Sequence, residues 1–194
     1  MAKHIDSVAN SYIPRVSNAG FYALCRGGDL VLCSGADGIS VPIERETNSP
    51  FSHVLMLWTD DVFYKWMTLE STIEKGVHLG NFDEYADRYA GDLVLCRRPA
   101  LTEAQIRAEL LVGRELLGDK YDWIEEVSMA ARKAKLFSKL PVIKPKNELY
   151  CSGLQQAIAV NVLPFDIPGP DWATPEQIFT DSSVEAICAL LRAA

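Results

Sequence analysis

Cys151 is the cysteine best placed to act as a nucleophile. It follows a loop that contains Pro141 and Pro145, and it begins a stretch whose apolar residues recur at helical spacing, so it lies at a predicted helix start. The first N–H groups of a helix have no intrahelical partner and carry partial positive charge, and both properties stabilise a thiolate. They can also donate to a developing oxyanion, which is worth on the order of 10²–10³ in rate for each donor. The alternative is that Cys151 is simply a small residue of the hydrophobic core.

A thiolate nucleophile needs a base, and the chain has three histidines. His4 lies close to the N-terminus and His78 in a glycine-flanked segment, whereas His53 begins a predicted buried strand, from which an imidazole can be aimed. Glu70 ends the next strand-like run and is the candidate for fixing the tautomer of that imidazole. The alternative for His53 is a structural histidine bonded to a carbonyl, and the alternative for Glu70 is a solvated charge at a strand end.

The first half of the chain predicts the strands that would position these residues. The hexapeptide Gly-Asp-Leu-Val-Leu-Cys occurs at 28–33 and again at 91–96, and it predicts two similar strands after Gly-Asp turns. Chance similarity of two buried strands would predict the same local structure. Residues 52–58 form a predicted buried strand, and 66–71 form its antiparallel neighbour after a turn at Asp60-Asp61. We further expect a short helix within 4–26, a turn-rich polar stretch over 34–50, and short strands and loops over 77–95.

The second half of the chain has helical periodicity. Thr102 and Gln105 have the spacing of a capping box, and Gly118 ends the helix that they begin. The other predicted helices cover 123–137 and 150–160 and begin at Thr174-Pro175. Because strands come first and helices later, the sequence predicts an α+β fold in one domain, 1–194.

Composition disfavours several classes of protein. The 194 residues are 48% hydrophobic and 23% charged, as in an ordinary globular domain. Nineteen basic against 26 acidic residues give a net charge of −7, so we expect no nucleic-acid partner. Basic residues are nevertheless concentrated in 127–147, which holds six of them and no acidic residue. We interpret this run as a solvated helix face. The alternative is a patch that binds an anionic ligand or a membrane surface, and no other feature of the sequence supports a membrane surface.

The cysteines and the apolar runs indicate a cytoplasmic protein. The five cysteines are odd in number, widely spread and include no C-x-x-C pair, which is typical of thiols in a reducing compartment. The apolar runs are far shorter than the ~20 residues of a transmembrane helix, and the N-terminus lacks the apolar region of a signal peptide. No cluster of residues has metal-ligand spacing, so neither a metal nor a cofactor is expected, and the oligomeric state is left open.

Five short blocks also occur in a recognisable order. They are Gly28-Asp29-Leu30-Val31, Ser49-Pro50-Phe51-Ser52-His53-Val54, Leu69-Glu70-Ser71 with Gly76-Val77, Leu117-Gly118-Asp119-Lys120-Tyr121-Asp122-Trp123, and Tyr150-Cys151-Ser152. Each block is weak alone, but their order resembles the circularly permuted branch of the NlpC superfamily, papain-like cysteine hydrolases of the YiiX kind. The resemblance spans about residues 28–180.

The resemblance implies a circularly permuted papain-like (NlpC-type) fold, an antiparallel sheet or barrel packed against helices. The family's cysteine falls on Cys151, its histidine on His53 and its acidic residue on Glu70, with the Cys151 backbone N–H in the oxyanion hole. A thiol hydrolase acting on a small peptide, amide or acyl substrate through an acyl-enzyme is therefore expected. An acyltransferase of the lecithin–retinol type, with the same triad, and a catalytically silent binding module are the alternatives.

The sequence departs from the family at one position beside the nucleophile. The family usually carries a glutamate after the Cys-Ser pair, and this chain has Gly153. Without that carboxylate the helix start is more positive, which favours a thiolate, and glycine loosens the first turn. The candidate triad is unaffected, so the departure concerns substrate contacts or helix rigidity.

Overall fold

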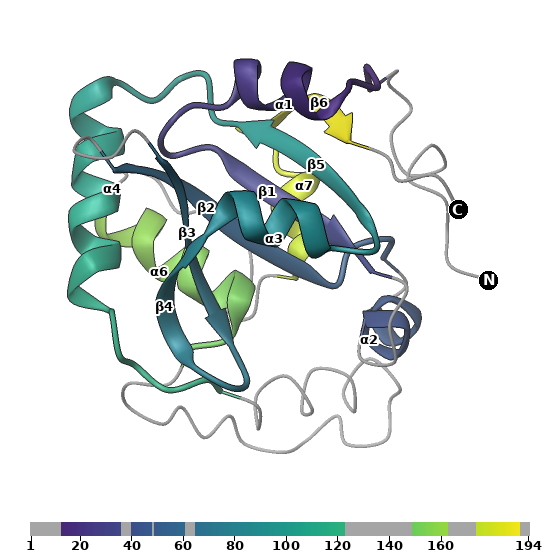
Figure 1. Ribbon diagram of the computed structural model, residues 1–194. Helices are drawn as coiled ribbons and strands as arrows, with labels where there is room; N and C mark the ends of the chain where they lie inside the picture. Colours follow the sequence, from purple (N-terminus) through teal and green to yellow (C-terminus); the bar gives the residue numbers. More distant parts are fainter. Residues whose placement is uncertain are drawn as a thin grey trace.

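The computed structural model describes residues 13–35, 40–47, 49–60, 65–122, 149–162 and 174–190. At its centre is a six-stranded antiparallel sheet with the strand order β4-β3-β2-β1-β5-β6 (Figure 1). The strands are β1 (Leu30–Ser34), β2 (His53–Asp60), β3 (Lys65–Thr72), β4 (Gly76–Asn81), β5 (Asp92–Arg97) and β6 (Glu185–Leu190). The helices are α1 (Asn18–Leu24), α2 (Ser40–Thr47), α3 (Phe82–Arg88), α4 (Glu103–Glu115), α6 (Cys151–Val162) and α7 (Pro175–Phe179).

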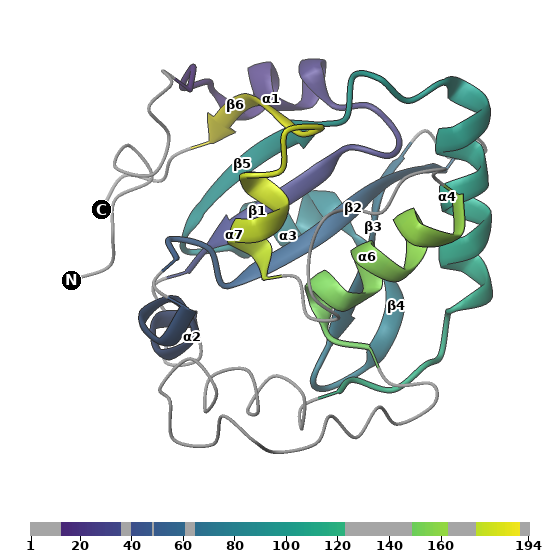
Figure 2. The same ribbon diagram turned by 180° about the vertical axis from the view of Figure 1, so that it is seen from behind.

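Helices cover both faces of the sheet. Figures 1 and 2 show α3 on one face and α6 and α7 on the other. Side chains of β1 alternate between two hydrophobic clusters: Leu30 and Leu32 pack with α6, and Val31 and Cys33 pack with α1 and α3. Because both faces of this central strand are covered, its apolar run is continuous rather than alternating.

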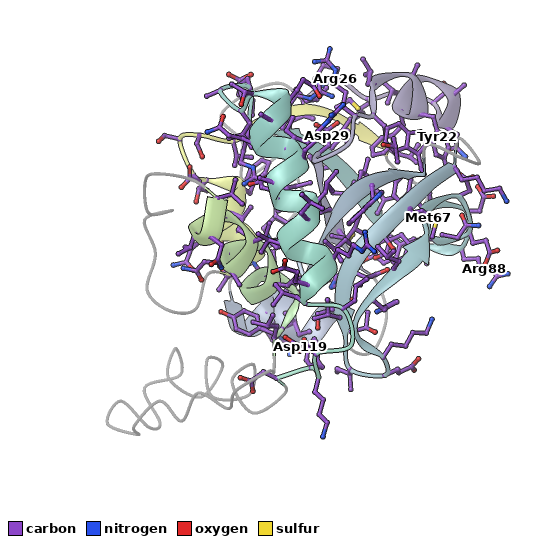
Figure 3. All side chains as sticks on the ribbon, turned by 90° about the vertical axis from the view of Figure 1, so that its left-hand side faces the viewer. Tyr22, Arg26, Asp29, Met67, Arg88 and Asp119 are labelled. Carbon is purple, nitrogen blue, oxygen red and sulfur yellow. The ribbon has the colours of Figure 1, made fainter. Side chains whose placement is uncertain are left out.

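The two copies of the repeated hexapeptide lie side by side. Strands β1 and β5 pair antiparallel, with Leu30 opposite Cys96 and Leu32 opposite Val94, so the prediction of two similar strands is confirmed. The carboxylate of Asp29 accepts hydrogen bonds from Arg97 Nε at 2.7 Å and from Arg97 Nη2 at 2.8 Å. This bidentate pair fastens the start of β1 to the end of β5, at the end of the molecule where α4 begins; Figure 3 labels Asp29 there.

Most predicted elements of the chain are confirmed. Strands β2 and β3 pair antiparallel, α1 falls within 4–26, and α6 begins at Cys151. The Thr102–Gln105 capping box is present at the start of α4, and α7 begins at Thr174-Pro175 with a second capping box. The predicted helix over 123–137, the whole basic run 127–147 and Asp61 of the predicted turn lie outside the described residues.

Two stretches expected to be irregular contain helices. The turn-rich stretch 34–50 holds α2, because Pro42 is only its third residue, where a helix does not use the missing N–H. The stretch 77–95 holds α3 besides its strands. The Oδ1 atom of Asn81 caps α3 by accepting from the backbone N–H groups of Asp83 and Glu84 at 3.0 and 3.4 Å.

The expectation that strands come first and helices later is wrong. Strand β6 follows α7 and pairs antiparallel with β5, and it also bonds to the N-terminal segment, where Val16 N–H donates to Ala189 O at 3.0 Å. Its residues Glu185–Leu190 are few and mixed, so the sequence signal for a strand is weak. The α+β class stands, with the strand order corrected. Among the described helices, none has the length and apolarity to cross a membrane.

A buried ion pair fixes α4 against the sheet. Arg98 Nη1 and Nη2 donate to Glu109 Oε1 and Oε2 at 2.6 and 2.7 Å. The Glu109 side chain is fully buried, and this burial raises the pKa of its carboxyl although the Arg98 charge opposes the shift. Helix α4 therefore depends on a charge that has no access to water.

We predict that Glu109→Ala lowers the free energy of unfolding by about 3–5 kcal/mol, because it leaves the Arg98 charge buried without a partner. Urea unfolding followed by circular dichroism measures this change. As a control, the double variant Arg98→Met, Glu109→Leu removes both charges and should recover most of the loss. A Glu109→Ala variant as stable as the wild type would contradict the prediction.

Candidate active site

Neighbouring strands bring His53 and Glu70 together. His53 is the first residue of β2 and Glu70 lies near the end of β3, and the two strands pair antiparallel. His53 Nε2 lies 3.0 Å from Glu70 Oε2, and the two side chains are 19% and 5% exposed. The imidazole therefore reaches solvent while the carboxylate behind it is buried, as in a base held by an orienting acid.

The second oxygen of Glu70 is also held. Thr68 Oγ1–H, from the same strand, donates to Glu70 Oε1 at 2.7 Å, and His78 Nε2 of β4 lies 3.8 Å from the same oxygen. A Cβ atom at Gly80 would lie 2.5 Å from Thr68 Oγ1 and 3.0 Å from Glu70 Oε1, so β4 needs glycine here. Thr68 and Gly80 were not predicted from the sequence, and His78 was set aside as a base. The only sequence signal for these contacts was the i, i+2 spacing of Thr68 and Glu70 in a strand.

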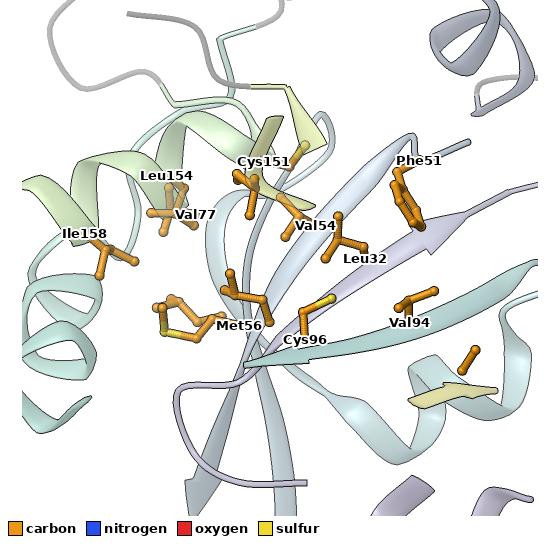
Figure 4. Close-up of a cluster of buried hydrophobic side chains, with 14 residues drawn as sticks. Leu32, Phe51, Val54, Met56, Val77, Val94, Cys96, Cys151, Leu154 and Ile158 are labelled. Carbon is orange, nitrogen blue, oxygen red and sulfur yellow. The ribbon is translucent and has the colours of Figure 1, made fainter. Parts of the chain in front are cut away.

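Cys151 is the first residue of α6. The backbone N–H of Leu154 donates to Tyr150 O at 2.9 Å, so the first helical hydrogen bond spans the cysteine. Figure 4 shows Cys151 beside Val54 of β2, at the edge of the buried hydrophobic cluster. The residue is 5% exposed, and the interaction of its side chain with the His53 imidazole raises the pKa of that ring. The structure thus brings all three predicted site residues together.

The contacts of the site change the pKa of its base and its acid. Burial by itself lowers the pKa of His53, but the hydrogen bonds to Cys151 and Glu70 and the charges of both outweigh it and raise this pKa from 6.5 to about 10. Burial would raise the pKa of Glu70, but the contacts with His53, Thr68 and His78 hold it below its usual value. Both shifts favour a charged imidazolium between the sulfur and the carboxylate.

The other four cysteines have a different environment. Burial raises the pKa of Cys25 to about 12 and that of Cys188 to about 11. Burial also raises the pKa of Cys33 and Cys96 far above the ordinary value, although a hydrogen bond from Tyr85 opposes the shift at Cys33. These four side chains therefore remain neutral thiols at physiological pH, and Cys151 differs from them in having a histidine partner.

Gly153, the departure from the family pattern, makes room for an aromatic ring. A Cβ atom at this position would lie 2.8–3.0 Å from three ring atoms of Tyr150. The ring packs on the first turn of α6, so the glycine allows a close contact immediately beside the nucleophile.

We predict that Cys151→Ala lowers the pKa of His53 towards 6.5, because the variant loses a hydrogen bond and a charge that both raise it. The ¹³C or ¹⁵N chemical shifts of the His53 ring, followed by NMR during a pH titration, measure the change. Cys25→Ala is the matched control, since it removes another buried thiol and should leave the His53 titration where it is. An unchanged midpoint in Cys151→Ala would show that the sulfur does not interact with the imidazole.

No family model matches this sequence, and no curated protein is significantly similar to it. Among solved structures, the chain is similar to the crystal structure of the metalloprotein YiiX from Escherichia coli O157:H7 (DUF1105), with a TM-score of 0.64 and 17% sequence identity. The similarity covers 86% of this chain and 98% of that one. Within the described ranges, no group of three or more His, Cys, Asp and Glu side chains could hold a metal ion, so we derive no chemistry through a metal. The comparison shows that this chain has a YiiX-like α+β fold.

Proposed function

We propose that this protein is a thiol hydrolase that cleaves an amide or ester bond through an acyl-enzyme on Cys151. The observation that carries the proposal is the position of His53, which contacts the Glu70 carboxylate at 3.0 Å and interacts with the side chain of Cys151 at the start of a helix. A nucleophile, a base within reach of it and a third group that orients the base make up the arrangement used in covalent acyl transfer.

The chemistry follows from these positions in two steps. The Cys151 thiolate attacks the substrate carbonyl carbon, and the backbone N–H of Cys151 donates to the resulting oxyanion. His53 then gives its proton to the leaving amine or alcohol as the C–N or C–O bond breaks, which leaves a thioester. In the second step His53 takes a proton from water, the hydroxide attacks the thioester, and the carboxylic acid leaves as the thiolate is restored.

Glu70 determines which ring nitrogen of His53 gives and takes the proton. Because His53 Nε2 faces Glu70 Oε2, the Nδ1 atom is left for Cys151 and for the leaving group. The carboxylate also stabilises the imidazolium that is present before attack. Thr68 in turn keeps Glu70 Oε1 in place, so the carboxylate cannot rotate away from the ring.

The resemblance noted in the sequence supports the finer assignment of a circularly permuted papain-like fold. The base and the acid lie on β2 and β3, ahead of the nucleophile's helix, which is the reverse of the order in unpermuted papain-like enzymes. Small peptides, amides and acyl esters are the substrates that we propose. All five cysteines are free thiols, which supports a reducing, cytoplasmic compartment.

We predict that iodoacetamide at pH 6 alkylates Cys151 faster than any other cysteine, because only this thiol has an imidazolium partner that favours the thiolate. Mass spectrometry of the digested protein identifies the modified residue. In His53→Ala the preference should disappear. Addition of EDTA should leave the rate unchanged, which tests the absence of a metal from this chemistry. Labelling of Cys151 no faster than that of Cys25 or Cys188 would end the enzyme proposal.

We further predict turnover on a panel of acyl esters and peptide anilides, with Glu70→Gln lowering kcat by about 10²-fold or more, because the imidazole loses its orienting charge. Release of the chromophore measures the rate, and hydroxylamine quenching traps the acyl group. An added alcohol or amine acceptor distinguishes the two acyl-transfer activities. Turnover that is unaffected by the acceptor supports the hydrolase; turnover that rises with it, with acylated acceptor as product, would assign an acyltransferase instead.

A further inference from the structure

Ser71 follows Glu70 directly in β3 and makes a contact that the proposed chemistry does not use. Its side chain is fully buried, and its hydroxyl donates a hydrogen bond to the backbone carbonyl of Leu149. Leu149 lies two residues before Cys151. Because successive side chains of a strand point to opposite faces, Ser71 leaves β3 on the side away from Glu70. One strand therefore contacts the base through one residue and the chain that leads to the nucleophile through the next.

The segment that carries Leu149 is held from a second side. The backbone N–H of Leu149 donates to Lys120 O at 2.8 Å, and the N–H of Val77 donates to Asp119 O at 2.8 Å. Figure 3 labels Asp119 beyond the end of α4. Leu149 is thus connected to the start of β4 through the residues that follow α4, and to β3 through Ser71.

Strand β3 also contacts α6 beyond the nucleophile. Gln155, one turn after Cys151, donates from Nε2 to the backbone carbonyl of Leu69 at 3.4 Å. Leu69 and Ser71 therefore bond to the chain on either side of Cys151, while Glu70 between them bonds to His53. Three consecutive residues of a rigid strand thus have contacts with both partners of the candidate catalytic pair.

We propose that Ser71 is a positioning residue of this site: its hydrogen bond to Leu149 places the start of α6, and hence the Cys151 sulfur, within reach of the His53 imidazole. The inference rests on the proposed function, since it concerns the same sulfur and the same base. It assigns a role to the third residue of the Leu69-Glu70-Ser71 block, of which the catalytic mechanism uses only Glu70.

The test compares three variants of the full chain. Ser71→Ala removes the hydroxyl, Ser71→Thr keeps it, and Thr102→Ala removes a hydroxyl that caps α4 away from the site. For each variant, the rate of Cys151 alkylation by iodoacetamide is measured from pH 5 to pH 9, the His53 ring is titrated by NMR, and thermal unfolding records the loss of stability. A purely structural serine would change only the unfolding temperature.

We expect Ser71→Ala to lower the alkylation rate at pH 6 by about tenfold or more, since a misplacement of about 1 Å can cost a reaction 10²-fold. The His53 midpoint should also fall, because the ring loses part of its interaction with the sulfur. Ser71→Thr should restore the rate and the His53 midpoint, and Thr102→Ala should change neither even where it unfolds at a lower temperature.

Two results would overturn the inference. Only the second of them would also contradict the proposed function. If wild-type Cys151 reacts rapidly and Ser71→Ala keeps its rate and its His53 midpoint, Ser71 has no positioning role and the proposed hydrolase stands. If wild-type Cys151 reacts no faster than Cys25, and His53→Ala changes nothing, the proposed function fails and the role of Ser71 fails with it. If Ser71→Ala is too unstable to assay at 25 °C, its alkylation rate and His53 midpoint are compared with those of Ser71→Thr at 10 °C, and equal values would overturn the inference.

Discussion

The buried carboxylate of Glu70 is the constraint on which the rest of this structure depends. Removing a charged group from water costs several kcal/mol unless hydrogen bonds and an opposite charge replace the lost hydration. Strands β2, β3 and β4 each supply one replacement: His53, Thr68 and His78. The strand order β4-β3-β2 is therefore the order that surrounds the carboxylate with partners. The contacts that compensate for the burial of Glu70 include the one with His53, which also helps to raise the pKa of that imidazole.

The five cysteines show how surroundings distinguish thiols that are all buried. Four of them lie in apolar surroundings that oppose ionisation. Cys151 is nearly as buried, at 5% exposure, but it lies at a helix start and beside an imidazole. Accessibility alone would not distinguish it from Cys25, which is 8% exposed. The electrostatic environment distinguishes it, and this difference is decided by the position of one histidine.

How much of the site the sequence predicts depends on whether a signal is local. Cys151 stands at a helix start that loop prolines and apolar spacing mark within a few residues, and His53 begins an apolar run that only a buried strand explains. No local pattern identifies Thr68 or Ser71, because their contacts become apparent only in the folded structure. Ser71 and Leu149, for example, are 78 residues apart in the sequence. Helix α3 was missed because its aromatic residues, with Phe82 and Tyr85 among them, also suit a strand, and β6 because its residues are few and mixed.

The late place of Cys151 in the chain also affects how the protein is made. Cys151 follows Glu70 by 81 residues, so it is synthesised later. Ribosomes add about 5–20 residues each second, so the growing polypeptide contains His53 and Glu70 for roughly 4–16 s before Cys151 is added. A nascent chain therefore contains His53 and Glu70 before it contains Cys151, so the three side chains can meet only after the start of α6 has been made.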